Sequence, residues 1–94
     1  MKIVINACYG GFSLSEKGIA RYLEIAGIKP SKNFYNRDIP RNDPALVQVV
    51  QEMGAAADGR CAALKIVNIP DDVQWQIEEY DGLEWVAEKH RTWE

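Results

Sequence analysis

The sequence predicts a single α+β domain over residues 1–94, a two-layer arrangement in which a mostly antiparallel sheet of about four strands carries two helices on one face. Two adjacent segments have apolar residues at helical spacing, and segments rich in β-branched or alternating residues flank them. An Asp-Gly pair separates the last two segments, which is a strong hairpin signal. The expected order of elements is therefore β-α-α-β-β-β.

The first strand is expected over residues 2–7, where β-branched side chains dominate and the glycines that follow end it. The first helix is expected to run to about Ala26, with Ser15 as its N-cap. Gly27 suits the position after a helix end, where the backbone turns left-handed. Residues 28–42 are expected to be irregular, and a loop of this length in a small domain is often functional.

The second helix is expected to begin at Asp43, which caps it, with Pro44 in its first turn. Asp58-Gly59 closes this segment. Residues 61–69 form the clearest strand, because they are apolar on both faces apart from Lys65. That pattern predicts a central position in the sheet.

The last two strands are expected over residues 73–78 and 83–88, although the spacing of the second segment also fits a helix. A two-residue turn at Asp81-Gly82 would place Trp75 opposite Glu88. We expect a three-residue turn instead, because register follows the buried face. That turn aligns four apolar side chains, which are Trp75, Ile77, Trp85 and Ala87.

Apolar residues make up 47% of the chain and charged residues 27%, which is typical of a globular domain and excludes a disordered one. No apolar run approaches the ~20 residues that cross a bilayer, and the first apolar stretch breaks at Asn6, too early for a secretory signal. We therefore expect a cytoplasmic protein without membrane contact. Cys8 and Cys61 are too widely separated for a disulfide framework or a metal motif, so buried free thiols, no metal and no cofactor are expected.

Charge is distributed unevenly along the chain. Residues 1–70 contain nine Lys or Arg and six Asp or Glu, a net charge of +3. Residues 71–94 contain two Lys or Arg and eight Asp or Glu, a net charge of −6. The acidic segment should repel nucleic acid phosphates. It is either a solvated strand face or a functional surface, which would bind and inhibit a basic partner protein or imitate DNA. The residues predicted for that surface are Glu78, Glu84, Trp85 and Glu88, with Trp93 as a second aromatic anchor.

The best candidate for a ligand site is the segment that joins the first strand to the first helix. Its glycines let the backbone approach a ligand, and a helix N-terminus exposes N–H groups that hold anions. The segment is neither a P-loop nor a dinucleotide fingerprint, and an ordinary turn followed by a cap would use the same residue types. The residues predicted to bind are Tyr9, Gly10, Gly11, Ser13 and Ser15.

Three arginines, Arg37, Arg41 and Arg60, are expected to assist, since their forked side chains suit phosphates and carboxylates. Arg37 and Arg41 would equally form surface pairs with the aspartates beside them. Together these residues predict a non-catalytic protein that captures a small anionic ligand, in its sharpest form a nucleotide-derived one. A domain this small is expected to complete the pocket with a second copy of itself.

A small hydrolase is the third alternative, with Cys8 or His90 as the reactive group. His90 is the only histidine, and nothing in the sequence brings it close to Cys8. No paired carboxylates have a spacing that indicates catalysis. The sequence therefore favours binding over catalysis.

Three segments carry a resemblance to known proteins: residues 5–15 (INACYGGFSLS), 37–44 (RDIPRNDP) and 80–88 (YDGLEWVAE). Together they resemble a family of short proteins encoded by tailed bacteriophages and prophages, and the resemblance spans nearly the whole chain. It implies expression in the cytoplasm of an infected bacterium, where small accessory phage proteins often inhibit host defence or sequester its ligands. The resemblance assigns no site residues.

Overall fold

The computed structural model describes residues 1–30 and 34–88, apart from the side chain of Arg37. Within these residues, two α-helices and four antiparallel strands confirm the predicted α+β class. In chain order the elements are β1 (Lys2–Asn6), α1 (Glu16–Ala26), the 3₁₀ turn η1 (Asn36–Asp38), α2 (Pro44–Met53), the 3₁₀ turn η2 (Gly54–Ala57), β2 (Leu64–Asn68), β3 (Trp75–Tyr80) and β4 (Leu83–Glu88).

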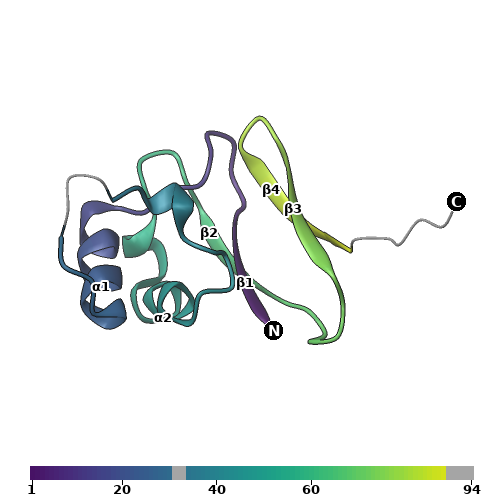
Figure 1. Ribbon diagram of the computed structural model, residues 1–94. Coiled ribbons are helices and arrows are strands. Elements are labelled where there is room, and N and C mark those ends of the chain that lie inside the picture. The colour runs from purple at the N-terminus through teal and green to yellow at the C-terminus, as the bar shows by residue number, and fades with distance from the viewer. Residues whose placement is uncertain (31–33, 89–94) are drawn as a thin grey trace, which may run out of the picture.

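The strands of the described chain form two separate two-stranded sheets, β1–β2 and β3–β4, instead of the single four-stranded sheet that the sequence predicted. Figure 1 shows the resulting layers, with the helices on one side, β1–β2 in the middle and the β3–β4 hairpin on the far side. β1 is therefore covered on both faces, since Ile3, Val4, Ile5 and Asn6 are all buried, whereas β2 is only partly covered.

The second edge of β1 explains why the two sheets stay apart. The Val4 amide donates to the Arg41 carbonyl oxygen at 2.8 Å, and the Asn6 amide donates to Glu84 Oε1 at 2.8 Å. These two acceptors occupy the donors that a third strand would need. The hairpin therefore packs as a layer of its own and does not extend the β1–β2 sheet.

Both helices begin where the sequence predicted and α1 also ends there, whereas α2 ends at Met53, so the predicted end at Asp58-Gly59 is wrong and residues 54–57 form η2. The Ser15 side chain accepts a hydrogen bond from the Gly18 amide at 3.0 Å, and Asp43 accepts one from the Ala45 amide at 2.8 Å. Gly27 follows α1 with φ 70°, in the left-handed region that favours glycine. Local sequence signals are therefore sufficient to define these ends.

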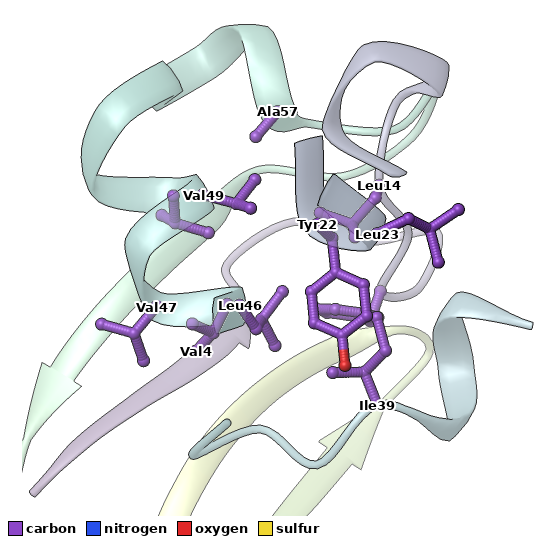
Figure 2. Packing of buried hydrophobic residues seen from close by; sticks show 11 residues of the cluster. Val4, Leu14, Tyr22, Leu23, Ile39, Leu46, Val47, Val49 and Ala57 are labelled. Atoms are coloured by element: carbon purple, nitrogen blue, oxygen red, sulfur yellow. The ribbon is translucent and has the colours of Figure 1, made fainter. Parts of the chain in front are cut away.

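The helices and the β1–β2 sheet enclose the main hydrophobic core, part of which Figure 2 shows. Tyr22 of α1 is buried in this core, and its hydroxyl donates to Asp43 Oδ2 at 2.7 Å. Burial, and then this hydrogen bond, raise the pKa of Tyr22 to about 12. The buried members of the cluster are Val4, Phe12, Leu14, Tyr22, Leu23, Ile39, Leu46, Val47, Val49, Val50 and Ala57.

The hairpin has the two-residue turn, so the predicted three-residue register is wrong. Trp75 lies opposite Glu88, and Ile77 lies opposite Val86. Asp81 and Gly82 have φ of 53° and 92°, both positive, which is the pattern of a type I′ turn. This turn matches the twist of the flanking strands, and that match outweighs the apolar alignment on which the prediction relied.

β2 is not a central strand, because within the described residues it pairs only with β1. Its two apolar faces arise from the layers on either side: Leu64 and Ile66 pack against the helical core, and alternation turns Val67 to the hairpin side. Cys8 and Cys61 are free but exposed, because both lie beyond the strand ends, so the prediction of burial is wrong. None of the described helices is long and apolar enough to span a bilayer.

Candidate ligand site

The turn after β1 packs directly against the turn of the β3–β4 hairpin, and the two lie side by side at the top of Figure 1. The Gly10 amide donates to the Asp81 carbonyl oxygen at 3.2 Å. A Cβ on Gly82 would overlap the backbone nitrogens of Gly10 and Gly11. Glycine at position 82 is thus required both by its φ and by this close approach.

Asn6, which is fully buried at the end of β1, ties three segments together. Its Nδ2 donates to the carbonyl oxygens of Cys8 at 2.6 Å and Gly82 at 2.7 Å. Its Oδ1 accepts from the Ala63 amide at 2.9 Å. The hydrogen-bonding capacity of this buried amide is well satisfied, so the relative position of the two turns is fixed.

A largely buried ion pair lies beneath the two turns. The Arg41 guanidinium donates to both Glu84 carboxylate oxygens, from Nη1 at 2.5 Å and from Nη2 at 2.8 Å. Its Cζ lies 3.7 Å from the centroid of the Phe12 ring. The two charged side chains are only 16% and 7% exposed. Glu84 was predicted as a partner-binding residue, but it is enclosed here and already paired.

A cavity of about 580 Å³ opens between the two turns. This volume lies in the range that small-molecule sites occupy. The ionisable groups in its lining are one arginine and two carboxylates. The lining residues are Gly10, Gly11, Phe12, Ser13, Arg41, Glu79 and Glu84.

The backbone of the residue 10–13 turn is only partly used inside the fold. The Gly10 amide is bonded to Asp81, and the Ser13 carbonyl oxygen accepts from the Gly59 amide at 2.9 Å. The amides of Gly11, Phe12 and Ser13 donate no hydrogen bond to any residue in the described ranges. Three main-chain donors in a segment that lines the cavity therefore have no partner among the described residues.

Four of the predicted ligand-binding residues meet at this cavity: Gly10, Gly11, Ser13 and Arg41. Ser15 is not in the lining, because its amide donates to the Ala57 carbonyl oxygen and its hydroxyl donates to that of Ala56. The start of α1 therefore packs on η2 and does not contribute to the cavity. Tyr9 and Arg60 are exposed and also lie outside the lining, and the side chain of Arg37 lies outside the described part.

Three lining residues were missed from the sequence: Phe12, Glu79 and Glu84. The last two are cross-strand partners in the two-residue-turn register. Choosing that register at the Asp-Gly pair would have placed both carboxylates on one face of the hairpin. The Asp-Gly pair therefore contained the information needed to place these carboxylates, but the three-residue register that we preferred put them on different faces.

The remaining predicted residues are spread over the hairpin or lie elsewhere. Trp85 is exposed, and its Nε1 donates to Glu78 Oε2 at 3.0 Å. Glu88, opposite Trp75, is exposed and belongs to the other face. Cys8 is exposed, whereas His90 and Trp93 lie outside the described residues.

No protein-family model, curated protein or solved structure matches this chain. The resemblance to phage-encoded proteins therefore stays a prediction from the sequence. Among residues 1–30 and 34–88, no three His, Cys, Asp or Glu side chains gather into a potential metal site. The geometry of the cavity is thus the basis for assigning a function.

Proposed function

We propose that this chain is a non-catalytic binding protein that captures a small anionic, nucleotide-derived ligand between the residue 10–13 turn and the β3–β4 hairpin. One observation carries the proposal: the cavity is lined by residues 11–13, whose amides have no hydrogen-bond partner among the described residues, and by Arg41, which retains unused donors. Fixed donors of this kind hold an anionic group without any bond-making step.

Arg41 supplies part of this donor set. A guanidinium has five N–H donors, and three are accounted for by the two bonds to Glu84 and a long contact from Nη1 to the Val4 carbonyl oxygen at 3.5 Å. The other two have no partner among the described residues. The pairing with Glu84 keeps the guanidinium in place, so it reaches the ligand in a fixed orientation.

The carboxylates narrow the class of ligand. Glu79 and Glu84 give the lining a formal charge of −1 when Arg41 is included, which disfavours a bare anion. Glu79 is exposed at the cavity and accepts hydrogen bonds from hydroxyl or amino groups. A nucleotide carries both an anionic phosphate and hydroxyls that a carboxylate binds. The lining therefore favours a nucleotide over inorganic phosphate.

One chain supplies the whole lining described above, so the proposal does not depend on a second copy. The homo-oligomer expected from the sequence stays a separate prediction. Inside an infected bacterium, capture of a nucleotide-derived signal would lower its free concentration. That is the way in which such a protein would counter a host defence.

The test is thermal unfolding with a panel of linear and cyclic nucleotides, nucleosides and orthophosphate. A ligand that binds only the folded state raises Tm by mass action. We expect at least one nucleotide to raise Tm, with a smaller effect of orthophosphate and of the matching nucleoside. The absence of any shift across the panel would refute the proposal.

Two neighbouring carboxylates provide a matched pair of variants. Glu79→Gln removes an acceptor from the cavity, and we expect about tenfold weaker nucleotide binding, the effect of losing one charged hydrogen bond. Glu78→Gln makes the same change on the opposite face of β3 and should leave nucleotide binding unchanged. Calorimetric titration of both variants measures the difference. Equal losses in the two variants would show that the effect is not specific to the cavity, and would contradict the assignment of Glu79 to the site.

A further inference from the structure

We propose that the outer face of the β3–β4 hairpin binds an extended, arginine-rich segment of a partner protein. The outer face is the side of the hairpin turned away from β1–β2, and it is separate from the cavity. Its central residues are Glu78, Tyr80 and Trp85.

The register of the hairpin defines this face. Alternation places Glu79 and Glu84 on the inner face, where Glu84 is buried against Arg41. The neighbouring pairs Glu78–Trp85 and Tyr80–Leu83 therefore lie on the outer face. Figure 1 shows the hairpin as the outermost layer, opposite the helices.

Two large aromatic side chains are left uncovered on this face among the described residues. Tyr80 is 70% exposed and Trp85 is 42% exposed. They belong to adjacent cross-strand pairs, so they form one surface and not two isolated positions. Exposed tyrosine and tryptophan are the residues that most often anchor a protein–protein interface.

The charge around these aromatics identifies the partner. Residues 66–88 contain no lysine or arginine, and residues 71–88 contain seven carboxylates. Glu84 is paired with Arg41, and Asp71 is paired with the amino group of Met1. Of the exposed carboxylates that are left, Glu78 lies on the outer face, Asp81 in the hairpin turn and Asp72 on the approach to β3, whereas Glu79 and Glu88 belong to the inner face. A partner must therefore be basic, which excludes nucleic acids and disfavours a second acidic hairpin.

The residue types favour arginine over lysine in the partner. A guanidinium is planar and stacks on an aromatic ring while its forked donors bind a carboxylate. Trp85 and Glu78 offer this combination, since the indole Nε1 donates to the carboxylate at 3.0 Å and the two groups lie side by side. Within the described residues β3 pairs only with β4, so its second edge is open to an extended segment.

The probe for this interaction is a fluorescein-labelled peptide of alternating arginine and valine, measured by fluorescence anisotropy. Peptides with lysine or glutamate in place of arginine serve as comparisons. We expect the arginine peptide to bind several-fold more tightly than the lysine peptide, and added salt to weaken both. Equal binding of arginine and lysine peptides, or no binding of either, would overturn the proposal.

Single substitutions test whether the peptide binds at the outer face of the hairpin. Trp85→Ala should lower the affinity for the arginine peptide about tenfold, which is the effect of losing an interface anchor. The conservative variant Glu78→Gln retains the indole of Trp85 and should lower the affinity for the arginine peptide by a smaller factor. Glu16→Gln removes the same charge from the exposed start of α1 and should change binding by less than about twofold. If Glu16→Gln weakens the peptide as much as Glu78→Gln, overall charge is responsible and the assignment fails.

Discussion

The two sides of the β1–β2 sheet are held by different kinds of interaction. On the helical side, α1 and α2 cover the sheet with an apolar cluster that includes the fully buried Leu46 and Val49. At the turn end of the hairpin side, the contacts are polar and directional: Asn6 bonds to Gly82, and Arg41 bonds to Glu84. The candidate cavity lies on this polar side.

The difference indicates where the fold tolerates change. An apolar core accepts substitutions that conserve volume, because dispersion and burial are not directional. A buried polar network requires every partner, since a half-satisfied network leaves groups without hydrogen bonds. The hairpin side should therefore be the more selective of the two, and the predictions below test this contrast from the largest effect to the smallest.

Leu46→Ala tests the helical side. Leu46 is fully buried, so truncation should lower the free energy of unfolding by about 4 kcal/mol. Chemical denaturation followed by far-UV circular dichroism and by tryptophan fluorescence should give coincident, shifted transitions, because the central sheet supports both layers. Transitions that separate would show that the two sides fold independently.

Glu84→Ala tests the polar side. It leaves Arg41 and the Asn6 amide without their partner, and we expect a loss of about 3 kcal/mol. Hydrogen exchange should accelerate mainly in β3 and β4. The double variant with Arg41→Met and Glu84→Leu should recover part of the loss, because it leaves no unpaired charge. Uniform acceleration over the helices as well would contradict the contrast between the two sides.

Gly82→Ala tests the close approach of the two turns. A Cβ at this position meets the backbone of Gly10 and Gly11 and also strains a φ of 92°, so we expect a loss of about 2 kcal/mol. Gly27→Ala is the control: its φ is 70°, but nothing lies within 4 Å of the added carbon. The control should lose only about 1 kcal/mol in urea denaturation. Equal losses would mean that backbone strain alone matters.

Tyr22→Phe removes one polar contact from the apolar side. Losing the hydrogen bond to Asp43 should lower the free energy of unfolding by about 1 kcal/mol near neutral pH. Because burial raises the pKa of Tyr22 from 10.0 to about 12, its contribution is complete below pH 10 and falls as the pH rises to 12. Urea denaturation at several pH values should show this decline in the wild type, whereas the phenylalanine variant should lack it.

The exposed pair Arg21–Glu52, which links α1 to α2, should have the smallest effect. Hydrogen bonding from Arg21 is the main cause that lowers the pKa of Glu52 from 4.5 to about 2. Any stabilisation is therefore present above pH 4.5 and is lost as the pH falls towards 2. Glu52→Gln should shift Tm slightly at pH 6 and not at all at pH 2, since an exposed pair contributes little.

Local signals predicted the local features of the fold. The caps at Ser15 and Asp43, the end of α1 at Gly27 and the position of the hairpin turn all follow from side chains within a few residues. Four of the cavity residues were likewise found from a glycine-rich turn and one arginine. These features depend on short-range chemistry that a single sequence contains.

Features that depend on distant pairs could not be predicted in the same way. The edge of β1 is closed by two bonds between residues far apart in the sequence, from the Val4 amide to the Arg41 carbonyl oxygen and from the Asn6 amide to the Glu84 carboxylate. The hairpin register is determined by the type I′ turn at Asp81-Gly82. The sequence also allowed a register that aligns apolar side chains, and the prediction followed that alignment. The register error moved Glu84 from the inner face of the hairpin to the outer face.

The approach of Gly82 to Gly10 and Gly11 also bears on the order of assembly. The cavity takes one wall from near the start of the chain and the other from near its end. Such long-range closure is slow compared with the formation of helices. A ribosome-bound chain that has emerged only as far as β2 contains only one wall of the cavity. The cavity is therefore completed late in synthesis, when the hairpin docks.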